Sequence, residues 1–458
     1  MTEKENIIHI LEKMKEKNID NSIDIEKVLQ FVKKQKYGLN FEKHTEEINE
    51  MFKTHIPIIE EIKEKRIEKN NGIYNLLIEG DNLHSLNVLK ETYSKSVDVL
   101  YIDPPYNTKK DFLYNDKILK KNDEYKHSCW LSFINERLQI AKELLTDKGI
   151  IFISIDEHES ANLKLLCDDI FGEKNFITEF LWKKSHGGST LSKCVRSNAE
   201  SIYCYAKNLN KIDFDFFGKV VKKNSDSPLI NMPNKYSTLI FPPYSIEFKS
   251  IKNGTIKSFK NNTTELHNDI FIKNYFNTNE VIFSNHWKWT QKKLKNELQQ
   301  NTKIISKTKN LKLRYIKEET TRIVKPTQFI TPEENVGYTI SASHELTNIL
   351  EENIFEYPKP VSLIKYLIKM VTYQNKDATI LDFFAGSGTT GQAVLELNEE
   401  DGGNRKFILC TNNENEICEK ITYQRLKTII TGIRKNGSKY SNGFDSNLKY
   451  YKCTFIKK

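Results

Sequence analysis

The stretch Asp103–Tyr106, a carboxylate followed by two prolines and a tyrosine, has the residue types that most directly suggest chemistry. It follows VDVLYI, a short run of β-branched and aliphatic residues that is typical of a buried strand. Because each proline fixes φ and lacks a backbone N–H, the pair predicts a stiff loop at the carboxyl end of that strand. Ligands of open α/β sheets bind at this edge. The alternative is an ordinary turn at the end of a strand.

A second stretch, ILDFFAGSGTTG at residues 380–391, joins a buried strand to a glycine-rich loop and the start of a helix. Gly386 and Gly388 allow a tight turn and a close approach of a ligand to the backbone, and the helix start offers free N–H groups. A phosphate-binding P-loop is excluded, because the loop lacks its Lys-Ser/Thr pair. The spacing of GSGTTG also fits a dinucleotide fingerprint, so this loop alone leaves NAD and other adenosine ligands open.

The elements that must position these loops alternate between strands and helices over residues 73–182 and 351–458. This alternation predicts an α/β domain with a mostly parallel sheet. Residues 183–350 interrupt it with short alternating runs that are typical of hairpins, so we expect an inserted α+β domain there. Residues 1–72 are expected to be helical, including the segment 55–72, because apolar residues recur at helical spacing and the segment ends on lysines, asparagines and a glycine.

Length and composition bound the class of protein. The 458 residues suffice for two or three domains, and the net charge of +9 suits a polyanionic partner without requiring one. The seven cysteines contain no CxxC pair, which argues against a disulfide framework or a metal site and fits a reducing cytoplasm. The N-terminus is charged throughout, and no apolar run reaches about 18 residues. We therefore expect a cytoplasmic protein without a membrane span.

The coincidence of DPPY and FAGSG in one α/β domain resembles DNA methyltransferases that methylate an exocyclic amino group with S-adenosyl-L-methionine. DPPY precedes FAGSG, as in the permuted β group, whose target-recognition domain lies between the two halves. Stretches such as GIIFISIDEHESANLKLLCDDIFGEKNFI and YPKPVSLIKYLI resemble the modification (Mod) subunits of type III restriction–modification systems. The resemblance covers most of residues 75–458. It implies a Rossmann-like methyltransferase fold, with residues 183–350 as the target-recognition domain and residues 1–72 as a packing, dimer or partner contact.

The resemblance also implies roles for the DPPY residues. Asp103 and the carbonyl of Pro104 would accept the two N6 hydrogens of a flipped adenine, Pro105 would keep the loop rigid, and Tyr106 would stack on the base. The methyl group would then move in one direct displacement, without a covalent enzyme intermediate. In that family an aspartate at this position favours adenine N6 over cytosine N4.

For the cofactor, the resemblance implies contacts from the glycine-rich loop and from other strand ends. The candidate cofactor-binding residues are Asp81, Lys359, Asp382, Phe384, Ala385, Gly386, Gly388, Thr389 and Glu414. Asp81 is also a natural helix N-cap, and Asn412 is an alternative to Glu414 as the ribose contact. Lys359–Pro360 resembles the helix start that closes the cofactor pocket.

Three other features have simpler interpretations. The FPPY of residues 241–244 has no carboxylate, so a turn after a strand is expected there. His186–Gly188 form either a mobile loop near the base or a plain linker, and the linker is favoured. Trp287 and Trp289 are expected in a core rather than on DNA.

The implied partners are double-stranded DNA, a second copy of this chain and a restriction (Res) subunit. Alternatives are an orphan adenine or N4-cytosine DNA methyltransferase, a catalytically silent DNA-specificity subunit, a protein-glutamine methyltransferase and a nicotinamide oxidoreductase. The intact DPPY and FAGSG argue against a silent subunit. Asp103 and the large insert argue against glutamine methylation, for which NPPY is usual, and GSGTTG alone supports the oxidoreductase.

Overall fold

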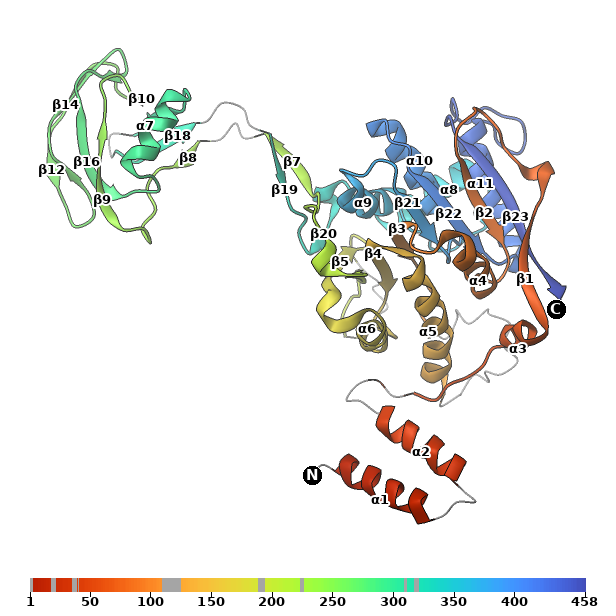
Figure 1. Cartoon of the computed structure of the whole chain (residues 1–458). Coiled ribbons are helices and arrows are strands. Elements are labelled where there is room, and N and C mark those ends of the chain that lie inside the picture. Colours follow the sequence, from red (N-terminus) through yellow and green to blue (C-terminus); the bar gives the residue numbers. More distant parts are fainter. Residues whose placement is uncertain are drawn as a thin grey trace. The chain divides into compact units, whose positions relative to one another are not determined.

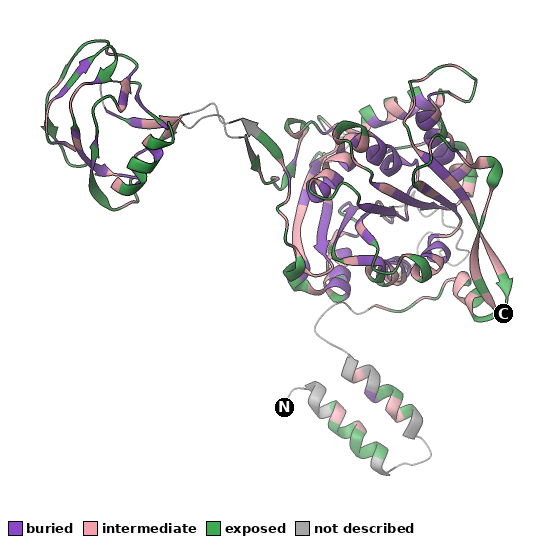
Figure 2. Ribbon diagram, turned by 45° about the horizontal axis from the view of Figure 1, so that its top comes forward, coloured by how far each residue is buried: buried purple, intermediate pink, exposed green. Residues whose placement is uncertain are grey.

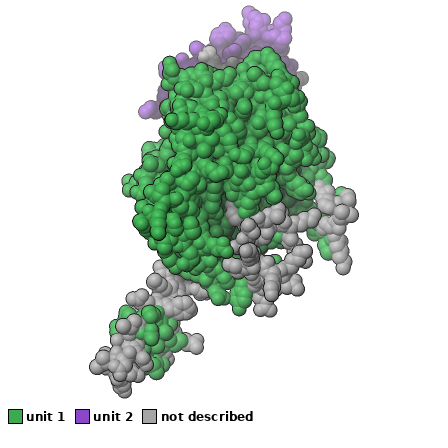
Figure 3. Space-filling view, turned by 90° about the vertical axis from the view of Figure 1, so that its right-hand side faces the viewer, with its two compact units in different colours: residues 1–217, 326–458 green, residues 218–325 purple. Residues whose placement is uncertain are grey.

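The computed structural model describes residues 3–17, 22–34, 39, 41–108, 125–187, 194–222, 226–308, 311–316 and 321–458. The chain forms two compact units, which Figure 3 colours separately. Unit 1 comprises residues 1–217 and 326–458, and unit 2 comprises residues 218–325. Unit 2 is therefore inserted between two halves of unit 1.

Helices and strands alternate along most of unit 1. In chain order they are α1 (Glu3–Lys17), α2 (Ser22–Lys34), α3 (Glu47–Thr54), β1 (His55–Glu61), β2 (Tyr74–Glu79), α4 (Asn82–Tyr93), β3 (Val97–Ile102), α5 (Lys126–Leu144), β4 (Leu145–Ile155), α6 (Ser160–Cys167), β5 (Phe176–Lys183), β6 (Ala199–Ala206), β20 (Phe329–Ile330), α8 (Thr339–Leu350), α9 (Val361–Thr372), β21 (Thr379–Asp382), α10 (Thr389–Asp401), β22 (Lys406–Thr411), α11 (Gln424–Thr431) and β23 (Asn447–Lys457). None of the described helices is long and apolar enough to cross a membrane.

The described strands of unit 1 form one sheet with the order β1-β23-β2-β22-β21-β3-β4-β6-β5-β20 (Figure 1). The central run from β23 to β4 is parallel throughout. Antiparallel pairs occur towards the two sides, where β1 joins β23 and where β6 joins β4 and β5. The predicted α/β fold with a mostly parallel sheet is confirmed.

Helices cover both faces of this sheet. Val99 and Ile380 face the core that contains α8 to α11, whereas the next residues along, Leu100 and Leu381, face the core that contains α4 to α6. The central strands are therefore buried on both sides (Figure 2). This double burial explains why they read as continuous apolar runs in the sequence.

The chain changes direction across the sheet between β21 and β3. From β21 it continues through α10 to β22 on one side, and from β3 it continues through α5 to β4 on the other. The two strands pair in parallel, Ile380 with Val99 and Leu381 with Leu100. Their carboxyl ends therefore meet at one edge, at the kind of switch point where open α/β sheets bind ligands.

The prediction of a helix over residues 55–72 is wrong. The helix α3 ends at Thr54, and His55–Glu61 form β1, which pairs antiparallel with β23. Pro57 is tolerated because β1 is an edge strand, where a missing backbone N–H leaves no interior strand unpaired. Pairing with β23, which is distant in the sequence, therefore outweighs the local helical pattern of this segment.

Unit 2 is smaller than the predicted insert of residues 183–350. β6 lies inside the large sheet of unit 1, and residues 326–350 also belong to unit 1. Because β6 pairs antiparallel with β5, the strand before it in the chain, their connection needs no crossover helix. The alternation of strands and helices therefore ends earlier in the sequence than this group of sheet strands does.

Unit 2 consists mainly of short, mostly antiparallel strands around a core of its own. Its elements are β7 (Lys219–Lys222), β8 (Ser227–Pro228), β9 (Tyr236–Phe241), β10 (Ile246–Phe248), β11 (Gly254–Ile256), β12 (Phe259–Lys260), β13 (Glu265–Leu266), β14 (Ile270–Lys273), β15 (Phe276–Asn277), β16 (Val281–His286), α7 (Gln291–Gln299), β17 (Lys303–Ser306), β18 (Leu313–Ile316) and β19 (Thr321–Val324). Trp287 and Trp289 are buried in this core, as predicted. The FPPY stretch is the predicted turn after β9, with Phe241 buried and Tyr244 exposed.

Candidate active site

The DPPY loop begins where β3 ends. Asp103 is the first residue after the strand, and Pro104 behind it is buried. The indole Nε1 of Trp130, on α5, donates to the carbonyl of Pro105 at 2.6 Å. The prolines already restrict this backbone. The bond from Trp130 also anchors it to α5.

The carboxylate of Asp103 is held by two neighbouring side chains. The hydroxyl of Tyr106 donates to its Oδ1 at 2.6 Å, and Nζ of Lys359 donates to Oδ1 and Oδ2 at 2.9 and 2.8 Å. Lys359 also donates to the hydroxyl of Tyr106 at 2.8 Å. Burial, followed by the charge of Asp103, raises the pKa of Tyr106, so its hydroxyl is a neutral donor.

Two residues to which no sequence motif points complete this cluster. Glu200 on β6 places Oε2 3.3 Å from Nζ of Lys359 and 3.4 Å from the hydroxyl of Tyr106. Lys184, directly after β5, donates to Oε1 of Glu200 at 3.1 Å. The signal available in the sequence was a lone carboxylate in the mostly apolar strand AESIYCYA.

Charge within the cluster outweighs burial. Burial acts to raise the pKa of Glu200, but the ammonium groups of Lys359 and Lys184 hold that pKa below its usual value. Burial acts to lower the pKa of Lys359, but the carboxylates of Asp103 and Glu200 raise it above its usual value. Glu200 and Lys359 are therefore both charged at neutral pH.

The glycine-rich loop starts at the neighbouring strand end. Asp382, the last residue of β21, is buried and accepts hydrogen bonds from the N–H of Phe384 at 3.0 Å and from the hydroxyl of Thr390. Burial raises the pKa of Asp382 to about 7, although both hydrogen bonds oppose this shift. This carboxyl group is therefore partly protonated near neutral pH.

Two glycines shape the loop at the start of α10. Gly386 and Gly388 have φ of +49° and +79°, in the left-handed region that favours glycine. A Cβ on Gly386 would lie 3.4 Å from the ring of Phe355, and one on Gly388 would lie 3.2 Å from Cγ2 of Thr422. Bare backbone beside a helix N-terminus suits an adenosine-type cofactor that approaches the chain closely.

A buried arginine braces this loop from behind, which the sequence did not indicate. Arg425 on α11 donates to the hydroxyl of Thr389 at 2.9 Å and to the carbonyl and hydroxyl oxygens of Ser387 at 3.3 and 3.2 Å. Burial lowers the pKa of Arg425 to about 10. Ala385 is anchored separately, by donating its N–H to the carbonyl of Cys410 at 3.1 Å. The hydroxyl of Thr389 thus has a structural partner in Arg425.

The remaining cofactor candidates lie at other strand ends. Asp81 follows β2 and caps α4, accepting hydrogen bonds from the N–H groups of Leu83 and His84 at 2.7 and 3.3 Å. It therefore fills the N-cap role that its position suggested. Asn412 and Glu414 follow β22, which runs parallel to β2 on one side and to β21 on the other.

The structure brings most of the predicted site residues to one edge of the sheet. Lys359, expected at the cofactor, contacts Asp103 and Tyr106 instead of the glycine-rich loop. His186 is exposed, with its ring 6.3 Å from that of Tyr338. Gly188 lies outside the described residues.

Residues 97–424 match the family model described as DNA methylase. The chain is 31% identical to the StyLTI Mod subunit of Salmonella typhimurium, covering 86% of this chain and 62% of that subunit. It is 35% identical to the EcoPI Mod subunit of Escherichia phage P1, covering 76% and 59%. It is 30% identical to the type II methyltransferase M.KpnI of Klebsiella pneumoniae, covering 82% and 90%.

The chain thus spans about three fifths of the length of the two type III subunits and nine tenths of M.KpnI. The family model includes both the loop after β3 and the loop after β21. The chain belongs to the DNA methylase family.

Proposed function

We propose that this protein transfers a methyl group from S-adenosyl-L-methionine to adenine N6 in double-stranded DNA, at a specific sequence and with the base flipped out. The observation that carries this proposal is the placement of the DPPY and glycine-rich loops on the adjacent parallel strands β3 and β21. An acceptor for an amino group and a cradle for an adenosine cofactor then share one edge of the sheet. Membership of the DNA methylase family supports DNA as the substrate.

Adenine N6 is a weak nucleophile because its lone pair is delocalised into the ring. The carboxylate of Asp103 and the carbonyl of Pro104 accept its two hydrogens, and these bonds favour the tetrahedral nitrogen of the transition state. The bond from Trp130 to the next carbonyl keeps the loop in place. Tyr106 supplies the aromatic surface for the flipped base. S-adenosyl-L-methionine, when bound, supplies an activated methyl group on its sulfonium.

The cofactor would be held by the glycine-rich loop and its neighbours. We assign this role to Asp382, Phe384, Ala385, Gly386, Gly388 and Thr389, with Asp81 and Glu414 at the flanking strand ends. The left-handed φ of Gly386 and Gly388 supports the assignment, since any side chain there would be strained and would crowd Phe355 or Thr422. Lys359 we assign to the base side of the site, where it contacts Asp103.

The charge of unit 2 supports its assignment as the target-recognition domain. Its 108 residues hold 21 Lys and Arg and 8 Asp and Glu, a net charge of +13. The other 350 residues hold 49 and 53, a net charge of −4, and the two values add to the +9 of the whole chain. A polyanion such as DNA is therefore attracted to unit 2.

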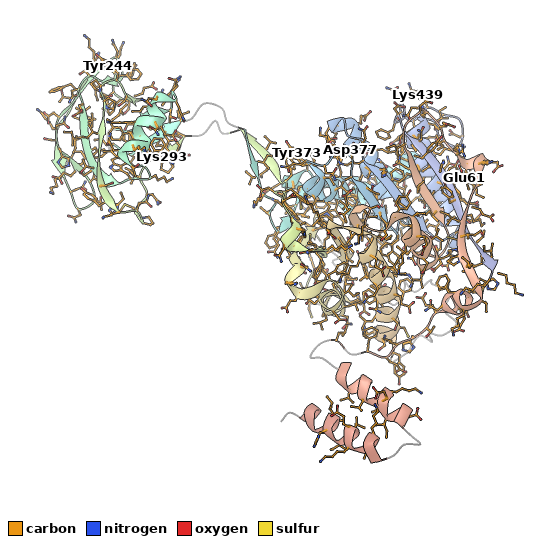
Figure 4. All side chains as sticks on the ribbon, viewed as in Figure 1. Glu61, Tyr244, Lys293, Tyr373, Asp377 and Lys439 are labelled. Atoms are coloured by element: carbon orange, nitrogen blue, oxygen red, sulfur yellow. The ribbon has the colours of Figure 1, made fainter. Side chains whose placement is uncertain are left out.

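The helix α7 offers a candidate surface for the phosphates. It exposes Lys292, Lys293 and Lys295, while Leu294 is buried in the core of unit 2 (Figure 4 labels Lys293). No ion pair joins any of the three to a described residue. By contrast, ion pairs with acidic residues are formed by Lys249 and Lys257, each directly after a strand of unit 2, and by Lys260 on β12. The ammonium groups of α7, which pair with no acid among the described residues, are therefore available to phosphates.

Likeness to the StyLTI and EcoPI Mod subunits supports a role as the modification subunit of a type III system. In that role the chain would act in the cytoplasm, as a homodimer and with a Res subunit. The helices before residue 72 or unit 2 would contribute to the dimer. A monomeric mass by light scattering, at micromolar protein with DNA present, would count against the dimer.

The function is tested by incubating the protein with methyl-labelled S-adenosyl-L-methionine and DNA, followed by nucleoside analysis. We expect label in N6-methyladenine. Label in N4-methylcytosine would overturn the choice of base, and unlabelled DNA would overturn the activity. Methylation-sensitive long-read sequencing of DNA from cells with and without the gene would then give the recognition sequence.

A further inference from the structure

We infer that Glu200 is a positioning residue for the proposed methyl transfer, and that it takes Lys359 away from Asp103 when the target base enters. The inference rests on the proposed function. Glu200 lies on β6, outside both the DPPY and the glycine-rich loop. Its part in the reaction would be to free the carboxylate on which the chemistry depends.

The carboxylate of Asp103, the proposed acceptor for adenine N6, already accepts hydrogen bonds from two side chains. Lys359 donates to both oxygens of Asp103, and Tyr106 donates to Oδ1. An amino group that enters must compete with an ammonium group for the same carboxylate. Moreover, N6 gains positive charge as it is methylated, so an ammonium group held beside it would raise the barrier. Lys359 therefore has to withdraw from Asp103 before transfer.

Glu200 offers the second position that such a withdrawal needs. Its Oε2 is 3.3 Å from Nζ of Lys359, compared with 2.8 and 2.9 Å for the oxygens of Asp103. The same Oε2 is 3.4 Å from the hydroxyl of Tyr106. Both groups that occupy Asp103 thus have Glu200 as their next acceptor. A small movement of either group exchanges one carboxylate for the other.

The charges balance only with Glu200 present. Asp103 and Glu200 contribute two negative charges, and Lys359 and Lys184 contribute two positive charges. The side chains of Lys359 and Glu200 are each only 10% exposed, so water screens these charges weakly. Without the charge of Glu200, Lys359 would bind Asp103 alone and more tightly, because a buried cation needs a partner.

The first test is Glu200→Gln, which keeps the size of the side chain and removes its charge. We expect the single-turnover rate constant at saturating DNA to fall by about tenfold or more, through lost access to Asp103. Glu200→Asp keeps the charge and should recover part of the rate. The matched control is Glu179→Gln on the adjacent strand β5, where Glu179 accepts a hydrogen bond from Ser201, and it should keep the parent rate.

A double-mutant cycle separates positioning from mere structural support. If Glu200 acts through Lys359, then Glu200→Gln should change the rate by less than about twofold in a Lys359→Met background. Equal losses in both backgrounds would overturn the inference.

Binding gives a readout that does not depend on methyl transfer. The parent should bind a duplex with adenine at the target more tightly than one with purine, which lacks the amino group. Glu200→Gln should reduce this preference, and an unchanged preference would contradict the inference. A parent protein that methylates no DNA contradicts the proposed function and the inference together. An active parent with an equally active Glu200→Gln variant contradicts the inference alone.

Discussion

Unit 1 and unit 2 differ in where their charged side chains lie. Unit 1 buries charged groups and pairs them, as with Arg137 and Glu46 or Arg405 and Asp401. In the described part of unit 2, Glu297 is the buried charged residue, and the excess of lysine lies at the surface. Buried and fixed charges act strongly on a nearby reacting atom, whereas many exposed charges of one sign together attract an approaching polyanion. The first arrangement suits catalysis and the second suits capture of a polyanion.

The sheets of the two units also differ in where they place functional side chains. Parallel strands covered on both faces bring functional groups together only at their ends, and in unit 1 that edge carries Asp103 and Asp382. Strands such as β14, with the alternating burial of Ile270–Lys273, expose every second side chain across a face. One architecture concentrates chemistry at an edge, and the other spreads contacts over a surface.

Asp103→Ala should break the chemistry of unit 1 without touching unit 2. The variant loses the acceptor that localises the N6 lone pair, so methyl transfer should fall by about a hundredfold or more. DNA affinity should stay near that of the parent. Single-turnover methylation and DNA titrations measure the two effects separately. Methylation at the parent rate would mean that DPPY is only a turn.

Exchanging residues 218–325 for the corresponding unit of a relative should change the methylated sequence and leave cofactor affinity intact. Base readout needs side chains that reach a groove, and unit 2 carries the positive charge. Sequencing of methylated DNA from cells that express the chimaera would show the new motif. An unchanged motif would remove unit 2 from recognition.

Lys292, Lys293 and Lys295 changed together to Gln should weaken DNA binding through unit 2 alone. Each lost phosphate contact flattens the slope of log K against log salt by about 0.9, so the slope should change by up to about 3. The matched control changes the ion-paired Lys249, Lys257 and Lys260 to Gln and should alter the slope less. Equal changes in the two triple variants would place the phosphate contacts elsewhere.

Tyr106→Ala should have a milder effect than Asp103→Ala. It removes a stacking surface worth about 1–3 kcal/mol, so part of the loss should be recovered when the adenine faces a mismatch that is easier to flip. Tyr106→Phe keeps the ring and should retain most activity, although it loses the hydrogen bond to Asp103. Single-turnover rates on paired and mismatched duplexes test both variants. No rescue by the mismatch would argue against stacking.

Asp382→Asn probes the buried charge of unit 1 through stability. The pKa of Asp382 is raised from 3.8 to about 7 in the folded protein, so the folded state binds the proton more tightly than the unfolded state does. Folding stability from this group is therefore present at low pH and is lost as pH rises to about 7. The melting temperature of Asp382→Asn, relative to the parent, should rise between pH 5 and pH 7 and then level off. A constant difference would show that Asp382 does not titrate there.

The sequence alone was sufficient to locate those parts of the site whose residues are close together along the chain. Asp103 directly follows its strand, and Asp382 to Thr389 span one strand end and one helix start, so propensity and turn chemistry were sufficient. Membership of the DNA methylase family, inferred from the same two loops, is confirmed.

What the sequence missed depends on pairing between distant segments. Glu200 reaches Lys359 because β6 pairs antiparallel with β4, and no short pattern encodes that pairing. Arg425 reaches Thr389 because α11 packs behind the loop. The helix predicted at the position of β1 is wrong for the same reason, since β1 pairs with the distant strand β23.

The position of β2 in the sheet has a consequence for synthesis on the ribosome. β2 lies between the strands β22 and β23, which begin at residues 406 and 447. At typical rates of translation, the nascent chain carries β2 without these neighbours for roughly 15 to 65 s. Its apolar residues Leu77 and Ile78, fully buried in the finished sheet, are then candidates for chaperone binding or misassembly. The described strands of unit 2 pair only among themselves, so the middle of the chain can finish folding before the catalytic edge exists.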